Sequence, residues 1–327
     1  MNLGVLSNEN LNPQTFWSMM APPLLEQLAL KNNAKLISPP PIASQNLGEW
    51  RRVLQSVRSA DTLFWMQVAA RPEISISLAS FLAGFARRSA FVVDAWRSSH
   101  TKIGLMTLAQ GLDPCFVGVR QGCLELKKRF PSARFEWMPF GADTDVFDAQ
   151  PGERSIFCYS MGRRHEPLHQ ALLRYCSDRG LNYLHSSNGE VRDRAELGRR
   201  VGSSQYFLVT PPDISDPARA EGYSPLVQRY VEGLSAGARL VGVLPKSGEY
   251  EMLLPLDAML QVAPDGSDLA AKLDTDRGNP DARLAVERAR IFVREHHSYA
   301  KRAEQIYTRL TTGQPIDFEQ MHVLNQA

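Results

Sequence analysis

Glu232 is a carboxylate on a predicted helix, but it lies off the apolar face of that helix. Residues 221–244 indicate loop, helix, turn and strand, and Ser224 and Pro225 suit the start of the helix. Apolar residues at helical spacing leave Glu232 to one side. Two interpretations stay open: Glu232 contacts a ligand, or it pairs with Arg229 on an exposed helix face.

Strands on either side would place this helix at the ligand-binding edge of a sheet. Residues 206–210 and 239–244 are short apolar runs typical of strands. Strand, helix and strand in this order form a parallel unit, and open parallel sheets hold ligands beyond the carboxyl ends of their strands. The same alternation runs from residue 3 to residue 263 and predicts parallel sheets with helices on both faces.

The alternation restarts after residues 149–153, whose Pro-Gly pair is the best linker signal in the chain. With 327 residues, the chain has the length of about two domains. We predict two Rossmann-like, doubly wound α/β domains, residues 1–150 and 151–327, that face a cleft.

The composition excludes several classes of protein. The chain is 43% hydrophobic and 22% charged, as soluble globular proteins are, and its net charge of +2 is too small to indicate nucleic acid. The start lacks a signal-peptide pattern and no apolar run could span a bilayer, so a cytoplasmic protein is expected. The cysteines lack metal-ligand spacing and are expected to be buried free thiols: Cys115, Cys123, Cys158 and Cys176.

Four motifs resemble, in the right order, those of glycosyltransferases with the GT-B fold. Residues 139–147, PFGADTDVF, resemble the segment that closes the first domain of that fold. Residues 160–164, SMGRR, resemble its phosphate loop, and residues 223–237, YSPLVQRYVEGLSAG, its donor-site helix. Residues 289–303, ARIFVREHHSYAKRA, are similar to a run in the family-four and CgeB-like branch of the group 1 glycosyl transferases.

This resemblance implies transfer of a sugar from a nucleotide diphosphate sugar to a glycan, lipid-linked or protein acceptor, in polysaccharide or glycoconjugate biosynthesis. It favours a retaining transfer without metal or cofactor. It assigns Glu232 to the ribose and Arg163 or Arg164 to the pyrophosphate, which suits a carboxylate and guanidinium groups respectively. It assigns the phosphate or sugar end to the backbone of Tyr223, Ser224, Pro225 and Leu226.

The resemblance also implies that the first domain supplies the acceptor site and any general base. Asp94 ends the predicted strand 90–94, and His100, whose pKa is ordinarily near neutral, follows six residues later. Alternatively, Asp94 caps the next helix and His100 lies on the surface. Asn8 and Asn10, in the first loop, could contact acceptor or phosphate.

Two departures from the family pattern leave other functions open. The first glutamate of the donor helix would fall on Ser224, and a lysine of the phosphate loop would fall on Leu168. His169 or Arg174 could replace that lysine. A non-catalytic binding or scaffold protein, or a nucleotide-sugar epimerase, therefore remain alternatives.

Other candidate sites have simpler explanations. Asp143 and Asp145 fit a turn better than a metal site, and His296 with His297 fits a helix break. Arg87 with Arg88, or residues 127–129, could contact a membrane surface, although short basic clusters are usually solvated. The fold implies a C-terminal helix that could cross back to the first domain, and in the chain end after it Phe318, Met321 and Val323 could pack there. The oligomeric state is not specified.

Overall fold

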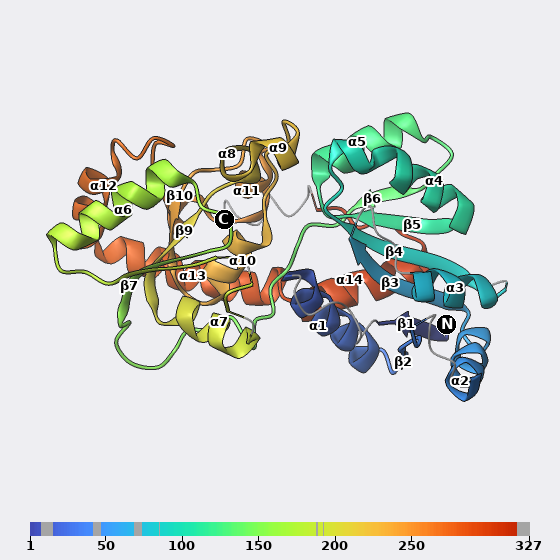
Figure 1. Cartoon of the computed structure of the whole chain (residues 1–327). Helices are drawn as coiled ribbons and strands as arrows, with labels where there is room; N and C mark the ends of the chain where they lie inside the picture. Colours follow the sequence, from blue (N-terminus) through green and yellow to red (C-terminus); the bar gives the residue numbers. More distant parts are fainter. Residues whose placement is uncertain are drawn as a thin grey trace. The chain divides into compact units, whose positions relative to one another are not determined.

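The computed structural model describes residues 1–7, 16–41, 47–68, 74–84, 86–187, 189–191 and 193–318. They form two units, each built on its own parallel sheet (Figure 1). Unit 1 comprises Met1–Pro139 and Tyr299–Ile316, and Phe140–Ser298 form the body of unit 2. The first unit thus ends earlier than the predicted 1–150 and gains a second segment from the far end of the chain.

Unit 1 contains six parallel strands in the order β2-β1-β3-β4-β5-β6. The central strands are mostly buried, and their middle and final residues are largely apolar, as expected for strands with helices on both faces. The strands are β1 (Leu3–Leu6), β2 (Lys35–Ile37), β3 (Thr62–Val68), β4 (Arg87–Val93), β5 (Leu112–Val117) and β6 (Phe135–Trp137). The helices are α1 (Phe16–Lys31), α2 (Leu47–Arg58), α3 (Ile74–Leu82), η1 (Arg97–Ser99), α4 (His100–Gln110) and α5 (Arg120–Arg129).

The last helix of the chain, α14 (Tyr299–Thr312), belongs to unit 1 and packs against α1 (Figure 1). Its Arg302 is buried and donates from Nε to the carbonyl oxygen of Pro139 at 2.8 Å, and its Arg309 pairs with Glu136. The return of a C-terminal helix to the first domain is confirmed. The expectation that Phe318 packs on the first domain is wrong, because the buried Phe318 groups with unit 2; Met321 and Val323 lie outside the described residues.

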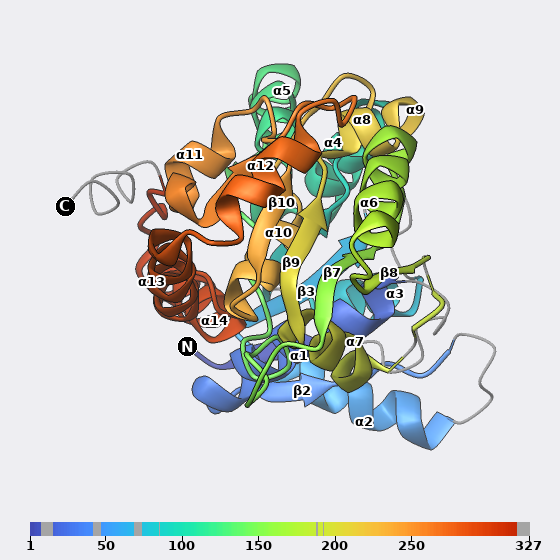
Figure 2. The same ribbon diagram turned by 90° about the vertical axis from the view of Figure 1, so that its left-hand side faces the viewer.

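Unit 2 contains five parallel strands in the order β11-β10-β9-β7-β8, four of which are labelled side by side in Figure 2. They are β7 (Ile156–Met161), β8 (Tyr183–Ser186), β9 (Ser204–Val209), β10 (Arg239–Gly242) and β11 (Met259–Gln261). The helices are α6 (Glu166–Asp178), α7 (Arg194–Gly202), α8 (Pro212–Ser215), α9 (Pro217–Ala220), α10 (Gln228–Ser235), α11 (Glu249–Leu253), η2 (Leu256–Ala258), α12 (Leu269–Asp276) and α13 (Pro280–His296). The predicted architecture of two doubly wound α/β domains is confirmed.

The core of unit 2 explains one departure from the family pattern. Leu168 lies in a cluster of buried side chains that α6 and α12 contribute to one face of the sheet, with Leu172, Leu269 and Leu273. A lysine could not keep its ammonium group solvated there. The position therefore serves packing in this chain.

All four cysteines are buried and free, as predicted. Burial raises the pKa of the Cys115 and Cys158 thiols, so neither is a reactive thiolate at neutral pH. In the described part of the chain, no helix is both long and apolar enough to cross a membrane.

Candidate functional site

A glycine turn after β7 presents two arginines. Gly162 has a φ of 85°, a left-handed conformation that favours glycine, and its N–H donates to the Ser186 carbonyl at 2.8 Å. Arg163 Nε lies 2.8 Å from the carboxylate of Asp216, and Arg164 Nε lies 3.7 Å from that of Glu166. Both predicted phosphate ligands therefore stand at the carboxyl end of a central strand.

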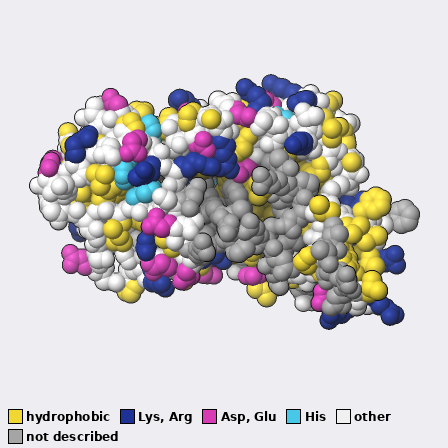
Figure 3. Space-filling view, viewed as in Figure 1, with side chains coloured by type: hydrophobic (Ala, Val, Ile, Leu, Met, Phe, Trp, Pro, Cys, Tyr) yellow, Lys and Arg dark blue, Asp and Glu magenta, His cyan; other side chains and the backbone are white. Residues whose placement is uncertain are grey.

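A small pocket opens at this end of the sheet. It is lined by polar and basic side chains and by Met161 and Leu208, and no carboxylate lines it. On the face of unit 2 in Figure 3, basic side chains gather beside histidines. Three of the lining groups are guanidiniums, so the pocket suits an anion. The lining residues are Ser160, Met161, Arg163, Arg164, His165, His169, Tyr183, Leu208, Thr210 and Arg229.

A chain of hydrogen bonds supports one side of this pocket. Arg164 Nη1 donates to His169 Nε2 at 3.4 Å, and His169 Nδ1 donates to the Tyr183 hydroxyl at 2.8 Å. The Tyr183 hydroxyl lies 2.9 Å from Ser160 Oγ, which lies 2.8 Å from His185 Nδ1. Arginine can only donate, so the first link makes Nε2 of His169 an acceptor and Nδ1 the donor to Tyr183. Burial lowers the pKa of both histidines, and Arg164 lowers them further, which keeps the imidazoles neutral.

The sequence does not predict most of this series of hydrogen bonds. It suggests His169 only as a replacement for the lysine of the phosphate loop, and no sequence pattern indicates a role for Tyr183 or His185. His185 faces Ser160 because β8 pairs in parallel with β7 in a register that sets these two residues opposite each other. That register depends on the strand order, which no local pattern contains.

The loop before the donor helix differs from the prediction. Helix α10 begins at Gln228 with Val227 as its N-cap, so Ser224 does not cap it. Ser224 Oγ instead donates to Asp213 Oδ1 at 2.7 Å and accepts the N–H of Lys246 at 2.9 Å. These two bonds connect the loop to Asp213 and Lys246, so the hydroxyl of Ser224 is used there and not at the start of the helix.

The loop backbone, which the resemblance assigns to the phosphate or sugar end of the donor, is already buried and partly hydrogen-bonded. Residues Tyr223, Ser224, Pro225 and Leu226 are all buried. The N–H of Leu226 donates to the buried carboxylate of Glu249, at the start of α11. In this structure the Leu226 N–H is therefore already used within the protein.

Glu232 is fully buried, and neither carboxylate oxygen has a hydrogen-bond partner among the described residues. Helix α10 lies so close to the sheet that a Cβ on Gly233 would stand 2.5 Å from the Phe207 ring and 2.6 Å from Leu240. Burial raises the pKa of Glu232 to about 8, although Arg229 and Arg194 oppose this shift. The alternative of an exposed Glu232–Arg229 pair is wrong, because Arg229 Nη1 donates to the Met161 carbonyl at 2.8 Å.

In unit 1, Asp94 and His100 stand near the carboxyl end of β4. Asp94 adopts a φ of 53° and is 9% exposed, and His100 is 2% exposed. His100 Nε2 lies 3.3 Å from the Ala95 carbonyl oxygen, and burial is the main cause that lowers its pKa. The alternative that His100 lies on the surface is wrong, and Trp96 and Ser99 occupy the N-cap positions of the following helices η1 and α4.

The sequence predicts the remaining candidate residues in a loop, a turn and a helix break. Asn8 and Asn10 lie outside the described residues. Helix α13 ends at His296 and α14 begins at Tyr299, so the predicted break is confirmed. Asp143 accepts the N–H groups of a turn and pairs with Arg194. The described residues contain no group of three or more His, Cys, Asp or Glu side chains placed to hold a metal ion.

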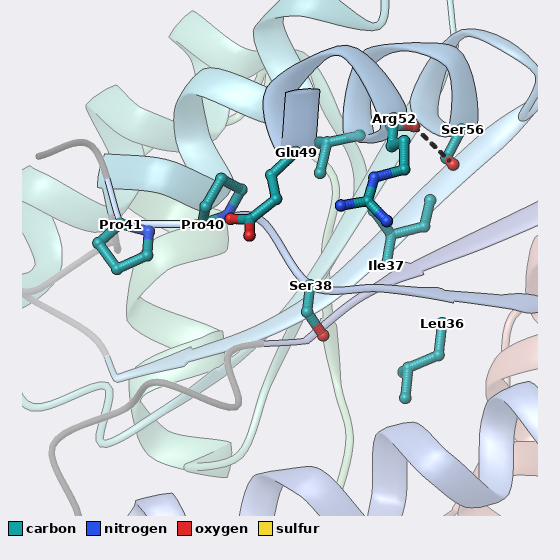
Figure 4. Close-up of a pocket in the computed structure, with 9 residues that line it drawn as sticks. Leu36, Ile37, Ser38, Pro40, Pro41, Glu49, Arg52 and Ser56 are labelled. Atoms are coloured by element: carbon teal, nitrogen blue, oxygen red, sulfur yellow. Dashed lines mark hydrogen bonds between the residues drawn. The ribbon is translucent and has the colours of Figure 1, made fainter. Parts of the chain in front are cut away.

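A second hollow, of about 370 Å³, lies in unit 1 beyond the carboxyl end of β2 (Figure 4). Glu49 and Arg52, from α2, line it together with Ser38, Pro40 and Pro41, and the Glu49 side chain lies beside Pro40 (Figure 4). Ser56 Oγ donates to the Arg52 carbonyl at 2.9 Å. The mixed charges and hydroxyl group suit a polar ligand of sugar size.

Comparisons with known proteins agree with this architecture. Residues 163–308 match a family model described as glycosyl transferase-like. The whole fold is similar to sucrose-phosphate synthase from Thermosynechococcus elongatus (TM-score 0.60, 11% identity, 96% of this chain and 100% of that chain). It is also similar to Anabaena HepE, solved with UDP and glucose (TM-score 0.57, 12% identity, 95% and 100%). AviGT4, a glycosyltransferase involved in avilamycin A biosynthesis, has a TM-score of 0.52 at 12% identity, covering 97% and 100%. A search of curated protein sequences gives no match.

Proposed function

We propose, from a GT-B fold whose residues 163–308 match a glycosyl transferase-like model, that this chain transfers a sugar from a nucleotide diphosphate sugar to a glycan, lipid-linked or protein acceptor. One observation carries the proposal: the fully buried, unpartnered carboxylate of Glu232. Burial without hydrogen bonds disfavours the carboxylate form of Glu232 and raises its pKa to about 8. A ribose diol, with two hydroxyl donors, would offset that effect of burial.

The remaining roles follow from the pocket and from the resemblance. Arg163 and Arg164 line the pocket and hold the diphosphate, because guanidinium forks match phosphate oxygens. Asp94, at the carboxyl end of β4, is the candidate that accepts the proton of an acceptor hydroxyl, and the buried His100 is the second candidate.

A thermal-shift panel of UDP-, GDP-, ADP- and TDP-sugars tests donor binding. UDP-glucose comes first, because HepE was solved with it. A ligand present at about 100 times its dissociation constant adds roughly 2.7 kcal/mol to the free energy of unfolding. Glu232→Ala should remove the shift, whereas Glu153→Ala, at an exposed position, should leave it unchanged. A shift that survives Glu232→Ala would refute the ribose role, and silence across the panel would refute donor binding.

A non-catalytic binding protein is the second candidate function. Leu168 is packed into the core where the family pattern has a lysine, so one phosphate ligand of that pattern is missing. Turnover separates the two candidates. Release of nucleoside diphosphate that depends on an added acceptor supports transfer, whereas tight donor binding without release across acceptor panels supports the binding protein.

A further inference from the structure

The three arginines of the unit 2 pocket are held in different ways. The side chains of Arg163 and Arg164 are 42% and 48% exposed, and each has a carboxylate partner, Asp216 or Glu166. Arg229 is partly buried, and its one hydrogen-bond partner among the described residues is the Met161 carbonyl. The structure gives this guanidinium a position but no counter-charge.

That position lies between two elements of the site. Arg229 extends from the first turn of α10 to the last residue of β7, directly before the glycine turn that carries Arg163. Nη1 is fixed by the carbonyl of Met161, while the side chain also lines the pocket. A guanidinium has five N–H donors, so one fixed edge leaves donors for a ligand.

The electrostatics of Arg229 favour an anion. Burial and the like charges of Arg163 and Arg219 act against the charged form of Arg229 and lower its pKa. Glu232, on the same helix, is near enough to stabilise the charge but forms no ion pair with it. A bound dianion would add a favourable charge beside a guanidinium that burial disfavours and that has no ion-pair partner among the described residues.

We propose that Arg229 is a diphosphate ligand, so that helix α10 binds the donor at two points, through Glu232 at the ribose and through Arg229 at the phosphates. The proposal rests on the proposed function. Arg229 is less exposed than Arg163 and Arg164, and its charge is not already paired with a carboxylate as theirs are. Arg229 should consequently contribute more to diphosphate affinity than either of them.

A ligand series tests this directly. Calorimetric titration of uridine, UMP, UDP and inorganic pyrophosphate into the full chain is compared with the same series for Arg229→Met and Arg229→Lys. Loss of a hydrogen-bonded charge predicts a UDP dissociation constant at least about ten-fold higher for Arg229→Met. Pyrophosphate should follow UDP, uridine should change less than about two-fold, and Arg229→Lys should fall between wild type and Arg229→Met.

Arg239→Met is the matched control, because Arg239 pairs with Asp276 at 2.7 Å and thus supports the fold of the same unit. It should lower the stability of the protein, but it should reduce the affinities for all four ligands by the same factor or leave them unchanged. An equal loss for uridine and UDP in Arg229→Met, or no loss, overturns the proposal. If Arg229→Met does not fold, unchanged UDP and pyrophosphate affinities in Arg229→Lys overturn it. If wild type binds pyrophosphate through Arg229 but binds no nucleotide, the donor function fails while the anion site stands.

Discussion

Replacing Glu232 with glutamine should change how the stability of the protein depends on pH. Burial raises the pKa of this carboxyl group from 4.5 to about 8. Between these values the folded protein holds a proton that the unfolded chain has released. The free energy of unfolding must therefore fall as pH rises from about 4.5 to 8. Glutamine has nearly the same shape and no proton to lose, so Glu232→Gln should lack this decline.

The magnitude follows from the size of the shift. Each pH unit by which the pKa rises corresponds to about 1.4 kcal/mol, so a rise from 4.5 to about 8 gives an upper limit of about 5 kcal/mol. Urea unfolding followed by circular dichroism at pH 5, 7 and 8.5 measures it. Glu232→Gln should match wild type at pH 5 and exceed it by several kcal/mol at pH 8.5.

The exposed Glu153 gives the control, because Glu153→Gln should follow the wild-type curve. A saturating nucleotide sugar should restore wild-type stability at pH 8.5, since ribose hydroxyls donate to the carboxylate. Parallel pH profiles for wild type and Glu232→Gln would show that the carboxyl group titrates normally, and the inference that it awaits a ligand would be withdrawn.

Three further substitutions have defined outcomes. Asparagine can adopt the φ of 53° found at Asp94, so Asp94→Asn should keep the local backbone. It should lower kcat by about 100-fold in a steady-state assay without changing donor affinity, and an unchanged kcat excludes Asp94 as the base. Arg302→Met deprives the Pro139 carbonyl of its donor and should lower the free energy of unfolding by about 2–4 kcal/mol; a loss below about 0.5 kcal/mol in urea contradicts this. Gly122→Ala places a Cβ 2.4 Å from the Ala95 carbonyl oxygen and should lower the melting temperature by a few degrees. A thermal unfolding curve identical to that of wild type would show that the backbone at Ala95 can shift without cost.

The sequence predicts those features of the fold that depend on local residue patterns. Apolar runs and helical periodicity identified the alternating elements, and β1 falls on the predicted residues 3–6. Helix α10 was placed three residues too early, because Ser224 and Pro225 have the residue types of a helix start. Tertiary contacts decided otherwise: the hydroxyl of Ser224 bonds to Asp213, eleven residues earlier.

The candidate site was predictable only in part for the same reason. Residue type and resemblance singled out Glu232 and Arg163, which do lie in unit 2. Burial of Glu232 could not be predicted, because it depends on how closely Gly233 lets the helix approach Phe207. Arg229 was considered only as an ion-pair partner, since its bond to the Met161 carbonyl spans 68 residues of sequence.

The membership of α14 in unit 1 has a consequence for synthesis of the chain. Domains generally fold as units, with the N-terminal one first as the chain emerges from the ribosome. Here Met1–Pro139 emerge first but lack α14, which packs on α1 and whose Arg309 pairs with Glu136. Phe140–Ser298 are complete before α14 is made. Until α14 has been made, the surface of the first unit that α14 covers stays open, and it must stay free of misassembly.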